Sequence, residues 1–559
     1  MKKNHVPVLV AVALIVVVVL IGVSTGLLER YSYSNERADL NAYFNVSGGE
    51  ETAIIYNDER IEEDAIYRDG HVYFPFSFVD QNLNNHFYYD MSEQQLLFTT
   101  DSALLSTAIG STDYTFGGEF VSEAYALTLA ANDTVYLADE FIKRFSNFSY
   151  QYFGEPNRVL IDTVWDEERH ATVKKDTQVR VLGGVKSEIL ADLQKGDDVR
   201  LVEEMDTWSL VTTYDGISGY VENKRIEETD PVTPAPVTDY VAPAYAPLER
   251  DGKICLVWNM VTNRDANAYA QGLLDSTQGV NVISPTWFAL SDDYGGFSSL
   301  ADAGYVTAMH NRGIQVWALL DNFTNKDVST ANVVNNTTSR RNLINGLIST
   351  ALEYHLDGIN VDFESVSTDA ARGYIQFLRE LYIECHKNGI ILSADNGYLL
   401  NYDRGRQGEA VDYVIIMGYD EHVAAADGVG SNASIDFVQS GIEKTVSQVP
   451  SAKVINAIPF YTRLWTTNGE IGQVAYGMNE IENFLNANGA TTVWDDAACQ
   501  YKAQFSVDGT NYEVWLEESE SIAVKLNIMS QYDLAGIAGW RLGQEKADIW
   551  NEIAAYLQQ

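Results

Sequence analysis

Cysteine and histidine are scarce in this chain of 559 residues, and neither forms a recognisable ligand pattern. Cys255, Cys385 and Cys499 stand far apart with no C-x-x-C pair, which argues against a disulfide framework and against a thiolate zinc site. The eight histidines are equally scattered and form no H-x-x-x-H pair. We therefore predict no metal site and no cofactor, and we expect the cysteines to be buried apolar residues.

Basic residues are also in short supply. The 37 lysines and arginines are outnumbered by 79 aspartates and glutamates, so the formal net charge is -42. Because this charge repels phosphate backbones, nucleic acid is not expected as a partner. The 33 tyrosines and 10 tryptophans suit sugar faces and ordinary protein cores equally well.

Long apolar runs are absent except for one near the N-terminus. Lys2 and Lys3 precede a nearly unbroken apolar run at residues 8–28, long enough at about 1.5 Å per residue to cross a hydrocarbon core of roughly 30 Å. We predict that residues 1–30 anchor the chain, with the lysines in the cytoplasm and the remainder on the extracellular face of the membrane or in the cell wall. The alternative is a cleaved signal peptide, which would also export the protein.

Proline is sparse, and five of the eleven prolines lie within residues 229–247. Such a stretch builds neither a regular helix nor a central strand, so residues 228–248 are predicted to be an extended linker. One hydrophobic core seldom serves more than about 250 to 300 residues, and we therefore expect several domains around this linker.

Two regions of β character precede the linker. Residues 171–227 contain short strands with closely spaced turns, which predict a small β-barrel. With W-x-x-V at residues 208–211 and G-Y-V at residues 219–221, this segment resembles the bacterial Src-homology-3-like wall modules, and the resemblance implies attachment to peptidoglycan. Residues 41–162, with "DGHVYFPFSFV" and "FYYDMSEQQLLFTT", resemble the small α+β repeat of the N-terminal domain of copper amine oxidases, here without copper; a plain spacer is the alternative.

After the linker, short apolar strands alternate with segments of helical period over residues 250–559. This alternation predicts a parallel (β/α)8 TIM barrel, and the long gap before the last strand predicts a small insertion there. The expected strands lie at residues 253–260, 280–288, 314–320, 357–364, 390–395, 412–420, 453–461 and 534–542.

The fourth strand, "LDGINVDFE", carries acids within an apolar sequence. Because side chains alternate along a strand, Asn360, Asp362 and Glu364 share the face toward the barrel axis. Glu364 falls at the C-terminal end of the strand, where the active sites of such barrels lie. The same stretch resembles the D-G-x-x-x-D-x-E signature of glycoside hydrolase family 18, with Asp357 and Gly358 as its structural start.

Other strands carry the same resemblance. "MGYD" at residues 417–420 is similar to the family's M-x-Y-D, and Trp540 is similar to its tryptophan on the eighth strand. "INAIPFYTRLW" looks most like the bacterial wall-active and spore-cortex branch. The resemblance implies that Glu364 is the general acid, that Asp362 orients the 2-acetamido group of the sugar, and that the Tyr419 hydroxyl hydrogen-bonds this group. It further implies a substrate-binding role for Trp540, Asp420, Asn360, Arg463, Tyr461 and Met417.

Asn360 departs from the family, whose chitinases usually have an aspartate there. An asparagine exchanges no proton but can donate a hydrogen bond through its amide. We expect Asn360 to donate to Asp362, to keep Asp362 more ionised than its chitinase counterpart, and to alter the pH optimum.

The resemblance implies hydrolysis of β-1,4 linkages in an N-acetylglucosamine-containing polysaccharide, peptidoglycan first and a chitin-like glycan second. The N-acetyl oxygen of the sugar would be the nucleophile, so the reaction would retain configuration although the second carboxylate does not attack. Two alternatives stay open. One is a non-catalytic lectin on the same barrel, against which the presence of Glu364 argues, and the other is an endo-β-N-acetylglucosaminidase acting on N-glycans.

Overall fold

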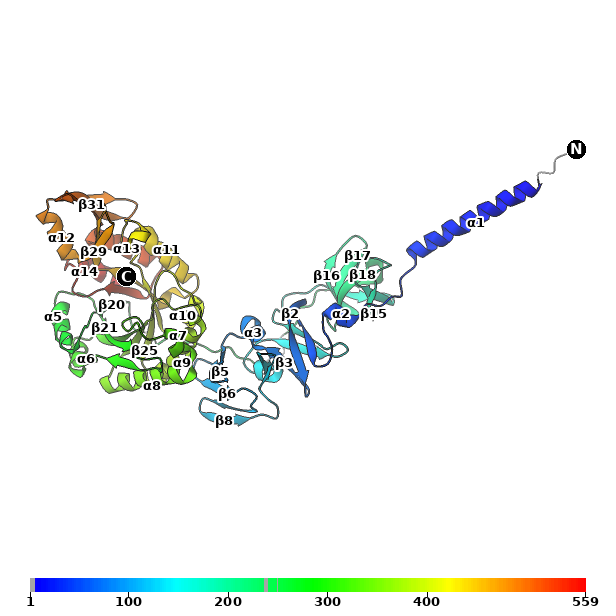
Figure 1. Cartoon of the computed structure of the whole chain (residues 1–559), viewed down its shortest axis with the longest axis horizontal. Coiled ribbons are helices and arrows are strands. Elements are labelled where there is room, and N and C mark those ends of the chain that lie inside the picture. Colours follow the sequence, from blue (N-terminus) through cyan, green and yellow to red (C-terminus); the bar gives the residue numbers. More distant parts are fainter. Residues whose placement is uncertain (1–5, 236–239, 249) are drawn as a thin grey trace. The chain divides into compact units, whose positions relative to one another are not determined.

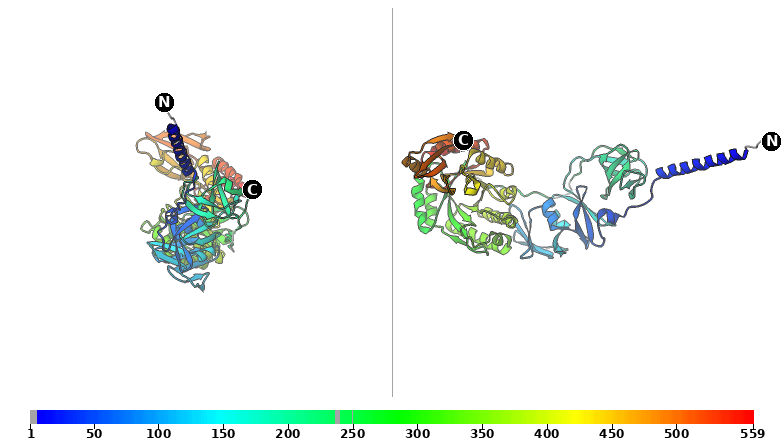
Figure 2. Two further views of the ribbon diagram at one scale, coloured as in Figure 1. Left: turned by 90° about the vertical axis from the view of Figure 1, so that its right-hand side faces the viewer. Right: turned by 45° about the horizontal axis from the view of Figure 1, so that its top comes forward.

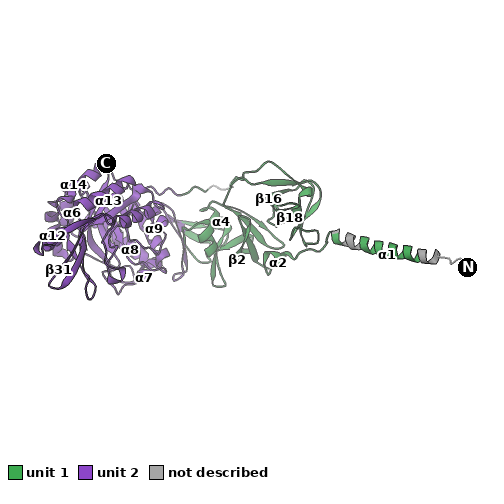
Figure 3. Cartoon of the chain, turned by 90° about the horizontal axis from the view of Figure 1, so that it is seen from above, with its two compact units in different colours: residues 1–87, 107–114, 120–242 green, residues 88–106, 115–119, 243–559 purple. Residues whose placement is uncertain are grey.

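The computed structural model describes residues 6–235, 240–248 and 250–559, and the side chains of residues 6–9, 25–29 and 31 also lie outside this description. The chain divides into two compact units, which are coloured separately in Figure 3 and are described one at a time. Unit 1 holds residues 1–87, 107–114 and 120–242, and unit 2 holds residues 88–106, 115–119 and 243–559.

A closed barrel of parallel strands forms the core of unit 2 (Figures 1 and 2). The strand order is β20-β33-β27-β26-β25-β24-β23-β21, and an additional pairing of β20 with β21 closes the ring. A short strand, β22 (Phe297–Ser299), adds to β21 in antiparallel fashion. The predicted multidomain chain with a TIM barrel is confirmed. Each barrel strand overlaps its predicted segment: β20 (Ile254–Asn259), β21 (Val282–Leu290), β23 (Gln315–Asp321), β24 (Gly358–Asp362), β25 (Ile391–Asn396), β26 (Tyr413–Met417), β27 (Val454–Pro459) and β33 (Gly536–Trp540).

Helices cover the outside of this barrel (Figure 1). The predicted alternation along β24 holds, because Phe363 points outward and its ring stacks at 5.7 Å on Tyr374 and on Phe377 of the next helix. Ile359 and Val361 are fully buried on the same apolar face. The helices of this layer are α5 (Ala270–Leu274), α6 (Ala303–His310), α7 (Thr330–Asn335), α8 (Thr337–Tyr354), α9 (Ala371–Lys387), α10 (Arg404–Glu409), α11 (Ile435–Val446), α13 (Ser519–Gln531) and α14 (Ile549–Leu557).

The predicted insertion lies between β27 and β33 and is confirmed. It consists of a five-stranded antiparallel sheet and one helix. The sheet order is β29-β28-β32-β31-β30, with β28 (Tyr461–Thr466), β29 (Gly472–Gly477), β30 (Thr492–Asp495), β31 (Gln500–Val507), β32 (Thr510–Trp515) and α12 (Met478–Ala487).

Unit 1 contains two further sheets. Residues 170–228 form a seven-stranded antiparallel sheet, where the sequence predicts a small barrel, with β13 (His170–Val173), β14 (Thr177–Arg180), β15 (Ile189–Leu193), β16 (Asp198–Glu204), β17 (Trp208–Thr212), β18 (Ser218–Glu222) and β19 (Ile226–Glu228). Backbone hydrogen bonds from Ala38 to Ile189 and from Ile189 to Glu36 attach residues 34–38 to its β15 edge. The sequence did not predict this attachment.

The second sheet of unit 1 has the order β11-β12-β1-β2-β3-β10-β9. Its elements, with the short helices beside them, are α2 (Leu40–Phe44), β1 (Glu51–Tyr56), β2 (Glu59–Arg68), β3 (His71–Pro75), α3 (Phe76–Phe78), β9 (Thr128–Ala131), β10 (Thr134–Ala138), α4 (Asp139–Lys143), β11 (Ser149–Phe153) and β12 (Arg158–Asp162). The mixture of strands and short helices agrees with the α+β character predicted for residues 41–162.

Residues 88–106 and 115–119 of the predicted α+β module belong to unit 2, and the rest of the module belongs to unit 1. A five-stranded sheet contains β4 (Phe87–Asp90), β5 (Gln95–Thr99), β6 (Leu104–Ala108), β7 (Asp113–Phe116) and β8 (Glu119–Ser122). Within unit 2, the buried carboxylate of Asp90 accepts hydrogen bonds of 2.6 Å from the backbone and hydroxyl of Thr337, at the start of α8. This contact spans 247 positions of sequence, and the sequence pattern gave no sign of it.

The N-terminal helix α1 spans Val6–Tyr31. A search of the described residues finds no helix that is long and apolar enough to cross a membrane. The predicted anchor, residues 1–30, includes residues 1–5, which lie outside the described residues, and side chains that the description also omits. Among the cysteines, Cys255 and Cys385 are buried as predicted, whereas Cys499 is partly exposed.

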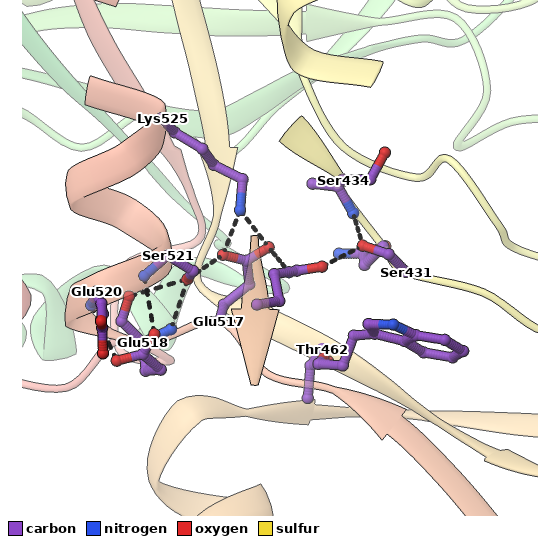
Figure 4. A network of polar contacts seen from close by, with 12 residues as sticks. Ser431, Ser434, Thr462, Glu517, Glu518, Glu520, Ser521 and Lys525 are labelled. Carbon is purple, nitrogen blue, oxygen red and sulfur yellow. Dashed lines mark hydrogen bonds and ion pairs between the residues drawn. The ribbon is translucent and has the colours of Figure 1, made fainter. Parts of the chain in front are cut away.

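A buried ion pair fastens the insertion to the barrel (Figure 4). Lys525 of α13 donates to both carboxylate oxygens of Glu517, at 2.9 and 2.8 Å, and both side chains are almost fully buried. Gln500 of the insertion donates to Glu517 at 2.6 Å and accepts a hydrogen bond from Ser431, which lies in the loop after β26. The insertion, α13 and this loop are therefore held by one polar network.

We predict that Lys525→Met lowers the free energy of unfolding by about 3–5 kcal/mol, because it leaves the Glu517 carboxylate buried without its cation. Urea unfolding followed by tryptophan fluorescence measures the loss. Lys387→Met is the control, since this lysine is about half exposed and its pair with Glu384 lies at the surface. Equal midpoints for the two variants would contradict the prediction.

Candidate active site

A cavity of about 780 Å³ opens at the C-terminal ends of the barrel strands. Six of the predicted site residues line it: Asp362, Glu364, Met417, Tyr419, Asp420 and Trp540. Apolar and aromatic side chains form much of the remaining wall, among them Trp287, Phe288, Phe323, Tyr398, Leu399 and Phe437. This position agrees with the place of active sites in such barrels.

Glu364 follows β24 directly and faces the cavity. Its backbone is held on both sides by Asn322, which accepts from the Glu364 amide at 2.9 Å and donates to its carbonyl at 3.0 Å. Partial burial, then the charges of Asp420 and Asp321, raise the pKa of Glu364 above its usual range. A glutamic acid that retains its proton toward neutral pH is suited to general acid catalysis.

Asp362 lies one inward step below Glu364 and is 5% exposed. Its Oδ1 atom is buried and receives no hydrogen bond from the described residues. Burial, followed by the charges of Asp395, Glu364 and Asp321, raises the pKa of Asp362 well above its usual range. Asp362 therefore holds a proton more readily than an ordinary aspartate.

Asn360 corrects two expectations. It is predicted to bind substrate, but it is fully buried among protein side chains and is not part of the cavity wall. Its Nδ2 donates to Ser393 at 3.0 Å and to Asp395 at 2.7 Å, while its Oδ1 accepts from Trp258 and Ser284. The predicted hydrogen bond to Asp362 is thus wrong, because both amide protons are used on β25. Among the described residues, no donor therefore offsets the burial of Asp362 Oδ1, and the expectation that Asp362 is more ionised than its chitinase counterpart stays a prediction.

Three polar residues at strand ends were missed by the sequence analysis: Asp321, Asn322 and Asp395. Asp321 ends β23 and pairs in register with Asp362, and its carboxylate accepts from the amides of Phe323 and Thr324. Asp395 lies on β25 and is 2% exposed. The pattern that identified Glu364, a polar residue at the end of an apolar strand, is also present at these positions and was available in the sequence.

Asp420 organises one rim of the cavity. Its Oδ1 accepts from the Tyr461 hydroxyl and from the Arg463 guanidinium, the latter at 2.5 Å. Arg463 also donates to Asn432 at 3.3 Å, in the loop that the Glu517 network holds. Tyr461 and Arg463 are not among the residues that line the cavity, and their hydrogen bonds to Asp420 connect them to its rim.

Trp540 and Tyr419 form the apolar floor. Trp540 ends β33, and its ring centroid lies 5.7 Å from that of the buried Trp258. Tyr419 is 8% exposed and follows β26, and the charges of Asp362 and Asp420 are close enough to act on its hydroxyl. Aromatic side chains close to several carboxyl groups suit a sugar ring, because the C–H groups on the faces of the ring are apolar and its hydroxyl groups are polar.

A family model for glycosyl hydrolases family 18 matches residues 217–545, which is more than half of the chain. The chain belongs to glycosyl hydrolase family 18. The family predicted from "LDGINVDFE" is thereby confirmed.

Two of the relatives of this chain are proteins of Bacillus subtilis (strain 168). The chain is 31% identical over 267 residues to YdhD of Bacillus subtilis (strain 168), named a sporulation-specific glycosylase, and the match covers 44% of this chain and 61% of YdhD. It is 25% identical over 232 residues to the cortical fragment-lytic enzyme of the same strain, covering 39% of this chain and 54% of that enzyme. The chain therefore spans less than two thirds of the length of either relative.

A solved structure supports the fold. The spore cortex-lytic enzyme SleL of Bacillus cereus matches with a TM-score of 0.50 and 20% identity, covering 55% of this chain and 74% of SleL.

The start of the family 18 motif serves the barrel rather than the cavity. Asp357 accepts from His310 of α6 and from the Val316 amide of β23, both at 2.8 Å. A Cβ on Gly358 would lie 2.6 Å from the Trp317 ring and 3.0 Å from the Ile391 carbonyl. Only glycine fits between these neighbours, which agrees with the structural role predicted for both residues.

We predict that Gly358→Ala lowers the free energy of unfolding by about 1–3 kcal/mol, because the added methyl group overpacks the space against Trp317. Gly272→Ala in α5 is the matched control, since a Cβ there meets no atom within 4 Å. Chemical unfolding of both variants tests the difference, and an equally stable Gly358→Ala protein would contradict it.

Proposed function

We propose that the protein is a retaining glycosidase that cleaves β-1,4 linkages after N-acetylglucosamine, with peptidoglycan as the first substrate and a chitin-like glycan as the second. The observation that carries this proposal is Glu364, a carboxyl of raised pKa on the cavity wall, two residues beyond the buried Asp362. Family 18 membership and the names of the cortex-lytic relatives support the substrate class.

The first step transfers the proton of Glu364 to the glycosidic oxygen. The N-acetyl carbonyl oxygen of the sugar attacks C1 as the bond from C1 to the leaving oxygen breaks, so a cyclic oxazolinium forms. Asp362 accepts a hydrogen bond from the acetamido N–H, and the Tyr419 hydroxyl donates to the acetamido oxygen. These contacts hold the acetamido group in line for attack.

The second step reverses the role of Glu364. Its carboxylate takes a proton from water, the water oxygen attacks C1, and the oxazolinium opens to release a sugar of unchanged configuration. Asp362 is not the nucleophile in this scheme, because the N-acetyl oxygen of the sugar attacks C1 in its place. Trp540 supports the sugar ring from below, and Asp420 binds a hydroxyl at the rim, with Tyr461 and Arg463 fixing its carboxylate.

The regions outside the barrel fit a protein of the cell envelope. In the sheet of residues 170–228, a Cβ on Gly219 would lie 2.6 Å from Val179 and 2.7 Å from the Arg180 carbonyl, so the predicted G-Y-V motif requires its glycine. This close packing supports the proposal that the sheet is a bacterial Src-homology-3-like module, and binding to peptidoglycan is proposed from the resemblance alone. Residues 41–162 are proposed to be an α+β spacer of the type predicted from the sequence.

We further propose that residues 1–30 hold the protein on the outer side of the membrane. The large apolar side chains of α1 between Val10 and Val23 support this, since each of them is about half exposed or more. We predict that the full chain sediments with membranes and is cut by protease added to intact cells, whereas a chain lacking residues 1–30 is soluble. A soluble full chain without a shortened N-terminus would contradict the anchor, and a shortened one would indicate a signal peptide.

We predict that Glu364→Gln lowers kcat on peptidoglycan and on chitin oligomers by about 100-fold to 10,000-fold, because the amide cannot donate the proton. Mass spectrometry of the products measures the loss. Glu353→Gln is the control, since it makes the same change on the exposed surface of α8. Equal product from wild type and Glu364→Gln would remove Glu364 from its role.

The same digestions separate the alternatives. Binding without product from any glycan would favour the lectin, and product from N-glycans alone would favour the endo-β-N-acetylglucosaminidase.

For the active wild type, kcat should fall on the alkaline side as the pH passes the raised pKa of Glu364, because the acid is then deprotonated.

A further inference from the structure

Two buried aspartates lie on neighbouring barrel strands, and one of them, Asp362, also lines the cavity. Strands β24 and β25 are parallel, and their register pairs Asn360 with Ser393 and Val361 with Ala394. The next pair in this register is Asp362 and Asp395. Neighbouring strands are about 4.8 Å apart, and both aspartates occupy inward positions, so their carboxyls face the same small volume.

Hydrogen bonding leaves one oxygen of each carboxyl without a partner. Asp395 Oδ1 accepts from Asn360 at 2.7 Å, whereas Asp395 Oδ2 and Asp362 Oδ1 are buried and receive no hydrogen bond from the described residues. Two ionised carboxylates in such a position would repel each other, and each oxygen would lack a donor. One proton between the two carboxyls removes both defects.

Asn360 orients the carboxyl of Asp395, which lies beside Asp362. Its Oδ1 is committed to Trp258 Nε1 at 2.9 Å and Ser284 Oγ at 3.0 Å, so its orientation is fixed. Its Nδ2 therefore points to β25 and can only donate, which orders the Asp395 carboxyl without competing for a proton.

We propose that Asp395 is the proton-holding partner of Asp362, and that the two carboxyls share one proton in place of the carboxyl that family 18 chitinases have at position 360. When Asp362 accepts the acetamido N–H, the shared proton moves to Asp395 and Asp362 meets the substrate as a carboxylate. One O–H bond breaks and one forms, with no other reactant. The catalytic half of this proposal rests on the proposed function, and the shared proton does not.

The surroundings favour the retention of a proton. Burial, opposed by the Asn360 hydrogen bond and increased by the charge of Glu364, raises the pKa of Asp395 to about 8. The other titratable groups that face the pair are acidic or phenolic: Asp321 from β23, Tyr419 after β26, Tyr374 from α9 and Tyr402 after β25. The charge of Arg404 acts on Tyr402, behind this layer.

Infrared titration of the full-length, substrate-free protein tests the shared proton. We expect a protonated-carboxyl band that persists to about pH 8 in the wild type and in Asp533→Asn, whose side chain is 93% exposed. In Asp395→Asn this band should disappear at a lower pH, because Asp362 loses the neighbour whose charge raises its pKa most, while Glu364 and Asp321 remain. An unchanged band in Asp395→Asn would overturn the proposal.

The pH profile of chitin hexamer hydrolysis tests the role in catalysis. Asp395→Asn should lower kcat at least about tenfold with a smaller change in KM, and should move the alkaline limb to lower pH. The exchange variant Asn360→Asp/Asp395→Asn, which returns the carboxyl to position 360, should recover activity and the profile. A kcat and alkaline limb equal to wild type in Asp395→Asn would overturn the role.

Two further outcomes are distinguishable. If Asp395→Asn fails to fold by circular dichroism, the folded exchange variant decides: a wild-type profile supports the pair, and an inactive protein argues against it. If the wild type hydrolyses no glycan, the proposed function fails, while the infrared titration still decides whether Asp362 and Asp395 share a proton.

Discussion

The crowding of carboxyl groups inside the barrel is the constraint on which the rest of the site depends. Asp321, Asp362, Glu364 and Asp420 line one cavity, and Asp395 lies buried on the strand next to Asp362. Asp362 and Asp395 are almost fully excluded from water. Buried carboxylates repel one another and lose hydration, so such a group cannot be fully ionised near neutral pH. The fold must provide either protons or donors for each of them.

The protein stabilises each of these carboxyl groups in a different way, and these differences determine which group can transfer a proton. Backbone amides satisfy Asp321, and Tyr461 and Arg463 satisfy Asp420. Glu364 is left with an open face toward the cavity and keeps a transferable proton. Of these acids, Glu364 is the one for which we propose proton transfer to the substrate, because it is only partly buried and faces the cavity.

Sequence periodicity was sufficient for the barrel, because apolar strands of β/α folds are continuous and their alternation fixes which side chains face the axis. Glu364, Asp362 and Tyr419 followed from one strand end and one motif. Asp395 did not, since its proximity to Asp362 depends on the register between strands 33 positions apart in sequence. Contacts of that kind, including Asp90 with Thr337, have no local signal.

Asn360 shows why a motif residue is best judged together with its cross-strand neighbours. Taken alone, an asparagine in place of aspartate removes a proton-holding group beneath Asp362 and suggests a weakened enzyme. Its amide instead orders Asp395, whose carboxyl lies one strand away at the level of Asp362. If an aspartate occupied position 360 as well, three carboxyls would compete for the same buried space. The asparagine is therefore consistent with an active site in which the number of buried carboxyls is kept and their position is changed.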